Sequence, residues 1–215
     1  MENQNFNIVG FGGHLIPTTL TRHDGAGLAV FLPGLRYANE MPMLYFTQKL
    51  LAERGYDVLT VNYSYPDIPE FMGASEPELS AWLKADAGAV MSAVLGLEGV
   101  RSLVIVGKSI GTALMAHLVP QLPHQDATRL VWLTPLLKGP SEFVRMQECR
   151  QASFLAIGTA DPGYDADMVA WFRACGHTAQ VFEGLDHGLE KPGSVSASIA
   201  ALRELLVALD QWLTP

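Results

Sequence analysis

Short apolar runs rich in β-branched residues alternate along the chain with longer segments of helical periodicity. The apolar runs are 28–34, 57–63, 103–107, 130–134, 153–158 and 178–183. The helical patterns cover about 42–54, 76–97, 109–122, 164–175 and 194–213. Strands of continuous apolar character that alternate with helices are typical of a parallel sheet covered on both faces. The pattern therefore predicts a three-layer α/β fold.

The start of the chain has a different pattern. The runs 6–10, 15–23 and 28–32 are separated by glycine-containing turn signals that leave no room for a helix. We therefore expect antiparallel N-terminal strands that lead into a mostly parallel sheet with right-handed crossovers. The absence of repeats and charged linkers predicts a single domain over residues 1–215.

Composition narrows the class of partner. The chain has 215 residues, of which 49% are hydrophobic and 17% charged, enough for a large buried core. A net charge of −8 and a pI near 5.1 argue against nucleic-acid and anionic-membrane partners, since both need concentrated Lys and Arg. No apolar run approaches the ~18 residues of a membrane span, and the first residues lack a signal-peptide pattern.

The two cysteines, Cys149 and Cys175, can form neither a disulfide framework nor a zinc site. We expect both to be reduced and partly buried. Together with the composition, this predicts a cytoplasmic protein without a metal or another cofactor; its oligomeric state stays open.

The sequence Gly107-Lys108-Ser109-Ile110-Gly111 matches the pattern G-x-S-x-G. A strand-like run leads into it and a helical pattern follows, which is the strand–turn–helix setting of a nucleophile elbow. The glycines allow strand and helix to approach closely, and the turn presents the Ser109 hydroxyl at the C-terminal edge of the sheet. A tight turn without chemistry is the alternative interpretation.

The Gly-Lys-Ser string within this motif also occurs at the end of phosphate-binding loops. Such a loop needs a glycine at position 102, where this chain has Ser. It also needs a flexible stretch over 103–106, where this chain has an apolar run expected to form a strand. Nucleotide binding is therefore not expected.

A serine nucleophile needs a base, and the base needs an orienting carboxylate. His187 follows the last predicted strand, and Asp161 directly follows the strand 153–158, so both lie at the same sheet edge as Ser109. We expect the other histidines to be solvated or packed, namely His14, His23, His117, His124 and His177.

Four other carboxylates were candidates for the acid. Asp165 and Asp167 begin the next helix, where carboxylates cap helix ends. Asp186 adjoins His187 and is expected to face solvent or the loop backbone, and Asp67 lies in a different part of the sheet. Asp161 is the preferred acid.

An oxyanion hole requires two N–H groups aimed at the developing negative charge. Ile110, the residue after the nucleophile, is expected to supply one. Leu35, after Gly34 in the loop that ends the strand 28–34, is expected to supply the other, since Pro33 has no N–H. A purely structural turn at Pro33-Gly34 is the alternative.

With these pieces the chain resembles an α/β-hydrolase, from about residue 6 to residue 213. The segments that carry the resemblance are LAVFLPGL, LVIVGKSIG, LAIGTAD and GLDHG, and the order Ser109, Asp161, His187 matches the order of triads in that fold. The similarity is to small, lidless members of the dienelactone-hydrolase-like and carboxylesterase type. Dienelactone hydrolases use a cysteine where this chain has Ser109, and many esterases carry His-Gly where it has Pro33-Gly34.

The resemblance implies a serine hydrolase that cleaves small carboxylic esters or thioesters through an acyl-enzyme. The segment 135–152, where lids of this family are usually inserted, has room for a helix but not for a cap domain. An open site favours soluble, short-chain acyl substrates. The segment 62–71 either walls the pocket or is a plain surface loop. The alternative function is a catalytically silent scaffold used for binding.

Overall fold

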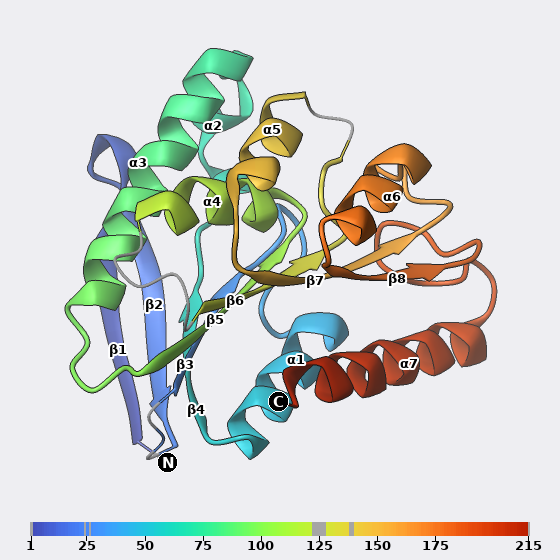
Figure 1. Cartoon of the computed structure of the whole chain (residues 1–215). Helices are drawn as coiled ribbons and strands as arrows, with labels where there is room; N and C mark the ends of the chain where they lie inside the picture. The colour runs from blue at the N-terminus through green and yellow to red at the C-terminus, as the bar shows by residue number, and fades with distance from the viewer. Residues whose placement is uncertain (1, 24, 26, 122–127, 138–139, 215) are drawn as a thin grey trace.

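The computed structural model describes residues 2–23, 25, 27–121, 128–137 and 140–214, and within them strands form an 8-stranded sheet (Figure 1). The strand order is β1-β2-β4-β3-β5-β6-β7-β8. The strands are β1 (Glu2–Val9), β2 (Leu15–Arg22), β3 (Gly27–Leu32), β4 (Tyr56–Val61), β5 (Ser102–Lys108), β6 (Thr128–Leu133), β7 (Ala152–Gly158) and β8 (Thr178–Phe182).

Helices cover both faces of this sheet. The helices are α1 (Pro42–Glu53), α2 (Pro69–Met72), α3 (Glu76–Leu95), α4 (Ile110–Leu118), α5 (Pro140–Glu148), α6 (Ala166–Ala174) and α7 (Val195–Leu213), with 3-10 turns η1 (Phe11–Gly13), η2 (Tyr65–Asp67) and η3 (Val119–Gln121). Apolar residues of α1 and α7 form the core on one face, and those of α3, α4, α5 and α6 form the core on the other. The three-layer α/β fold is thus confirmed.

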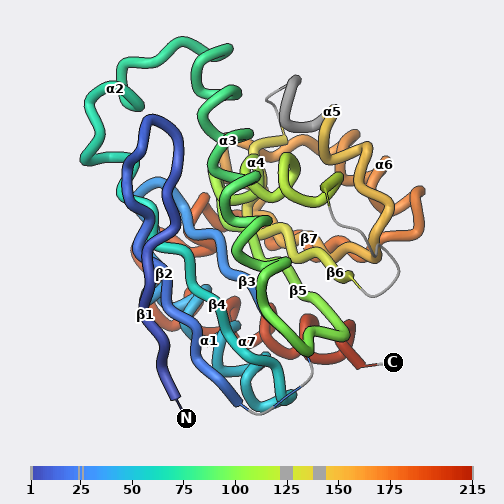
Figure 2. The backbone as a smooth tube through the Cα atoms, turned by 90° about the vertical axis from the view of Figure 1, so that its left-hand side faces the viewer, coloured from blue at the N-terminus to red at the C-terminus, as the bar shows by residue number. Residues whose placement is uncertain are grey.

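The N-terminal strands are antiparallel, as expected, but their neighbours differ from the chain order. β1 pairs with β2, and β2 pairs antiparallel with β4 rather than with β3. β3 instead lies between β4 and β5 and is parallel to both. Its continuous apolar run suits this central place, because a central parallel strand is buried on both faces. The β1–β2 hairpin lies beside α3 at the edge of the sheet (Figure 2).

The parallel strands β3 to β8 all end at one edge of the sheet. The loops that follow β3, β5, β7 and β8 therefore meet there, and these loops carry the residues predicted to form the site. Between β6 and β7 the described residues form α5 and no cap domain. No helix in the described part of the chain is long and apolar enough to cross a membrane.

Most predicted elements match those observed to within a few residues. The helix predicted over 109–122 is shorter, because α4 ends at Leu118 and a 3-10 turn follows. Pro120 contributes to this end, since proline has no N–H to donate to the carbonyl four residues earlier in the chain.

Candidate active site

Ser109 lies on a sharp turn between β5 and α4. Its backbone has φ 53° and ψ −119°, in a positive-φ region that residues with a side chain rarely adopt and that costs about 1–3 kcal/mol. The surrounding structure holds this conformation. The Ser109 N–H donates to the Leu133 carbonyl at 3.0 Å, and the Ser109 carbonyl accepts from the Thr112 N–H at 2.8 Å.

The two glycines of the motif are required by close backbone approach. A Cβ at Gly111 would lie 2.0 Å from the Leu32 carbonyl oxygen, and one at Gly107 would lie 2.8 Å from the carbonyl oxygen of Gly111. The elbow therefore packs helix α4 directly against the ends of β3 and β5.

The structure brings Ser109, His187 and Asp161 into one hydrogen-bonded chain. The His187 Nε2 atom is 2.9 Å from the Ser109 Oγ, and the His187 Nδ1 atom is 2.8 Å from the Asp161 Oδ2. Asp161 is buried, whereas the His187 side chain is 35% exposed. A base hydrogen-bonded to a serine and oriented by a buried carboxylate has the geometry that nucleophilic catalysis requires.

Backbone contacts fix Asp161 and the loop that carries His187. The Asp161 Oδ1 accepts from the Gly163 N–H at 2.8 Å. The Ala160 N–H donates to the Leu185 carbonyl at 3.0 Å. This contact ties the turn after β7 to the loop after β8, so the carboxylate and the imidazole are held by the same two strand ends.

Two of the competing carboxylates accept hydrogen bonds elsewhere. Asp165 is the N-cap of α6, where its side chain accepts from two backbone N–H groups. The Asp186 Oδ1 accepts from the N–H groups of Gly188 and Glu190, so this side chain faces the loop backbone, as expected. Asp67 lies in η2.

Among the described residues, the histidines other than His187 take no part in the hydrogen-bonded chain. His14 Nε2 lies 3.4 Å from a buried carboxylate of Asp86. The ring of His177 contacts that of Phe172, and burial lowers the His177 pKa. His117 lies on α4 and lines a small cavity. His124 is outside the described residues.

One candidate oxyanion donor directly follows Ser109 in the chain, and the other follows Gly34, where a Cβ would lie 3.6 Å from the Ser109 Cβ. Ile110 begins α4, and Leu35 lies in a turn closed by the Gly34 N–H, which donates to the Tyr37 carbonyl at 2.9 Å. Within the described residues, neither the Leu35 nor the Ile110 N–H donates to a backbone acceptor. Both are thus available to a ligand oxygen.

Lys108, which the sequence analysis did not single out as a site residue, packs against the 34–37 turn. Lys108 is only 3% exposed, and its Nζ lies 4.8 Å from the centre of the Tyr37 ring. Burial lowers the Lys108 pKa to about 8, against the opposing charges of Asp161 and Asp186. Alternation along β5 could have indicated this, since Lys108 shares the face of Val104 and Val106, which is buried under α1 and α7.

The buried aromatic residues of the 62–71 segment show that it is not a plain surface loop. Tyr63, Tyr65 and Phe71 are buried and stack on one another, with ring centres 4.3 Å and 4.1 Å apart. The Tyr63 hydroxyl donates to the carbonyl of Pro33. Neighbouring residues of the segment line a hollow of about 400 Å³ together with the 34–37 turn. The segment is therefore a wall beside the candidate oxyanion hole, with its aromatic side chains packed into the core.

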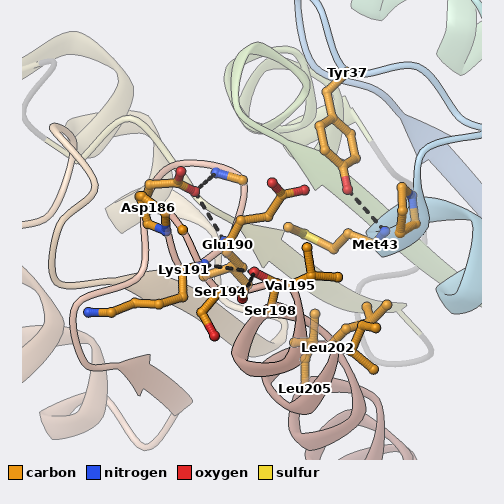
Figure 3. A pocket seen from close by; sticks show the side chains of 16 residues that line it. Tyr37, Met43, Asp186, Glu190, Lys191, Ser194, Val195, Ser198, Leu202 and Leu205 are labelled. Carbon is orange, nitrogen blue, oxygen red and sulfur yellow. Dashed lines mark hydrogen bonds between the residues drawn. The ribbon is translucent and has the colours of Figure 1, made fainter.

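Two further cavities lie close to the site. One of about 140 Å³ is lined by Ile110 and by side chains of α3, α4 and α5. A larger one of about 460 Å³ lies behind the His187 loop, between Tyr37, Met43 and the start of α7 (Figure 3). Ser109 lines neither of them. Tyr37 lines both the larger cavity and the hollow beside the 34–37 turn.

The cysteines are both free, but their burial differs. Cys149 is buried and Cys175 is exposed, so the expectation of two partly buried thiols was wrong for Cys175. Its place at the C-cap of α6 explains the exposure. Among the described residues, no group of His, Cys, Asp and Glu is arranged to hold a metal ion.

Comparison with solved structures identifies the fold. A protein of unknown function from Agrobacterium tumefaciens, described as an α/β-hydrolase, is 16% identical with TM-score 0.73 and covers 98% of this chain and 94% of its own. An α/β serine hydrolase without a lid from Xanthomonas campestris is 17% identical with TM-score 0.71, and the match covers 99% of this chain and 94% of that protein. A Pyrococcus furiosus esterase is 12% identical with TM-score 0.72, and the match covers 99% of this chain and 90% of that protein.

No family model matches the chain, and the curated proteins contain no significant match. The structural similarity covers nearly the whole chain at low identity. The chain therefore has the lidless α/β-hydrolase fold.

Proposed function

We propose that this protein is a serine hydrolase that cleaves small carboxylic esters or thioesters through an acyl-enzyme. The observation that carries the proposal is the continuous hydrogen-bonded chain from Asp161 through His187 to the Oγ of Ser109, on a backbone turn that is strained at the serine. The likeness to α/β serine hydrolases and esterases supports the same class of reaction.

In the first half-reaction, the Ser109 Oγ attacks the acyl carbon while its proton passes to the Nε2 of His187. The negative charge that develops on the acyl oxygen is stabilised by the N–H groups of Leu35 and Ile110. Asp161 holds the imidazole in the required tautomer and stabilises the imidazolium. The imidazolium then protonates the leaving alcohol or thiol, which leaves Ser109 acylated.

In the second half-reaction, His187 removes a proton from water, which attacks the acyl-enzyme. The same two N–H groups stabilise the second oxyanion, and collapse of this intermediate releases the acid and restores the Ser109 hydroxyl. The exposed imidazole edge and the open hollow beside the 34–37 turn allow water to reach the acyl carbon.

The size of the surrounding cavities supports small acyl substrates. The hollow beside the 34–37 turn measures about 400 Å³ and the cavity beside Ile110 about 140 Å³. The residues that the structure describes between β6 and β7 form α5 rather than a cap. The site is therefore open to solvent, which suits soluble substrates better than lipid droplets.

Labelling with a fluorophosphonate probe tests the proposal, because the probe reacts only with an activated serine. We expect one label, at Ser109, that is lost in Ser109→Ala and kept in the matched control Ser92→Ala, whose serine lies exposed on α3. A folded wild-type protein that takes no label would instead be a silent scaffold. A panel of p-nitrophenyl esters and acyl thioesters of graded length then identifies the acyl preference.

A further inference from the structure

Lys108 is a buried ammonium that the reaction steps above do not use. It precedes Ser109, yet its side chain points to the α1 and α7 face of the sheet, and it is only 3% exposed. Among the residues that the structure describes, its Nζ makes no hydrogen bond and no ion pair within 4.0 Å. A buried ammonium without such partners lowers stability, so stability does not explain the presence of Lys108 at this position.

The contacts of this side chain are with the 34–37 turn. The Cδ of Lys108 packs closely on Gly34: a Cβ added at Gly34 would lie 2.9 Å from this Cδ. Its Nζ lies 4.8 Å from the centre of the Tyr37 ring, within the range of a cation–π interaction, which is stronger when the cation is desolvated.

Tyr37 in turn fixes the shape of the turn. Its carbonyl accepts from the Gly34 N–H at 2.9 Å, and its N–H donates to the Gly34 carbonyl at 3.3 Å. Its hydroxyl accepts from the Met43 N–H at 3.0 Å at the start of α1 (Figure 3). Leu35, a candidate oxyanion donor, lies inside this closed turn. The direction of its N–H therefore depends on where Tyr37 is held.

We propose that Lys108 is a positioning residue for the oxyanion hole: its buried ammonium holds the Tyr37 ring and thereby the turn that presents the Leu35 N–H. This inference rests on the proposed function for the role of Leu35. It makes the charge of Lys108, and not only its carbon chain, a requirement for full activity.

The charge can be removed by pH as well as by mutation. Burial lowers the Lys108 pKa to about 8, so the ammonium is present at pH 7 and lost as the pH rises through about 8. The other groups that face Lys108 and Tyr37 are Asp161, Asp186 and Glu190. Burial raises the Tyr37 pKa above its ordinary value, and Glu190 raises it further. Tyr37 therefore stays neutral in this range.

The test compares Lys108→Met, which keeps a stem of similar length without the charge, with wild type. Lys49→Met is the matched control, because Lys49 also lies over a tyrosine ring, 5.3 Å from the centre of Tyr45, but is exposed on α1. At pH 7 we expect kcat for a p-nitrophenyl ester to fall about three- to tenfold in Lys108→Met with KM little changed, since an oxyanion donor acts in the transition state.

Wild type and Lys49→Met are expected to lose activity by a similar factor as the pH rises through about 8, and Lys108→Met is expected to lack this step. A Lys108→Met variant with wild-type kcat at pH 7 and an unchanged alkaline profile would overturn the proposal.

A second measurement does not depend on catalysis. A double-mutant cycle of Lys108→Met and Tyr37→Leu, measured by chemical denaturation, is expected to show coupling at pH 7 that is lost at high pH. Absence of coupling at pH 7 would overturn the inference, and so would coupling without any effect on kcat. A wild-type protein that takes no fluorophosphonate label but shows the coupling would refute the proposed function, and with it the role given to the turn.

Discussion

Replacement of Asp161 by Asn is the sharpest test of the proposed triad, because the structure determines which way the new amide must face. The Oδ1 of Asp161 accepts from the Gly163 N–H, and the Oδ2 accepts from His187 Nδ1. In Asp161→Asn, the amide oxygen is needed at the Gly163 N–H. The NH2 group then points at His187 Nδ1, which becomes an acceptor.

This orientation places the imidazole proton on the wrong nitrogen. His187 Nε2, 2.9 Å from the Ser109 Oγ, then carries the proton and cannot accept the one from the serine. In the opposite orientation the new NH2 group would face the Gly163 N–H, so two donors would meet. An unpaired buried donor costs about 1–3 kcal/mol. Loss of the negative charge also removes the stabilisation of the imidazolium. The expected fall in kcat is about 10⁴-fold.

The assay measures kcat for a p-nitrophenyl ester and the rate of fluorophosphonate labelling, with melting temperature as a check of the fold. Asp186→Asn is the matched control: its amide oxygen can keep the two loop N–H bonds that the Asp186 carboxylate accepts, so most activity should remain. An Asp161→Asn variant within about tenfold of wild type would refute the reasoning.

Three further variants test other parts of the structure. Gly111→Ala is expected to lower the free energy of unfolding by about 3 kcal/mol or more, because its Cβ would lie 2.0 Å from the Leu32 carbonyl oxygen; thermal melting measures this. Tyr65→Phe removes a 2.7 Å hydrogen bond to the buried carboxylate of Asp86 and should cost about 1–3 kcal/mol in denaturation while activity is kept. Lys108→Met should raise stability at pH 7 by up to about 3 kcal/mol, because the unfolded lysine holds its proton up to its ordinary pKa of 10.5 whereas the folded one loses it near 8. This gain in stability should be lost as the pH rises from about 8 to 10.5. An equal gain at pH 7 and at the upper end of this range would contradict the prediction.

Local patterns in the sequence predict the elbow and the order of the elements. A strand that runs into G-x-S-x-G and then into a helix specifies a tight turn, because only glycine allows the approach that Gly107 and Gly111 make to neighbouring backbone. Continuous apolar strands predict a parallel sheet, and a parallel sheet brings the ends of its strands to one edge. The positions of Ser109, Asp161 and His187 after three such strands therefore place them at a common edge before any distance is known.

Contacts between distant segments could not be predicted in the same way. The antiparallel start of the chain is visible in the sequence, but the pairing of β2 with β4 instead of β3 is not. Hydrophobic periodicity states which face of a strand is buried, but not which strand lies next to it. The same limit applies to the 62–71 segment, whose aromatic residues were compatible with a pocket wall and with a surface loop.

What the sequence by itself determined is the local chemistry: a serine on a tight turn, a histidine and a carboxylate at the ends of strands in the order of an α/β-hydrolase. Tertiary structure alone decided that the three side chains meet within hydrogen-bonding distance. It also decided that Lys108 lies buried under the 34–37 turn. The physical reason is that turn and strand preferences depend on neighbours in the chain. Burial of a charge and contact between side chains depend instead on how strands and loops far apart in sequence pack together.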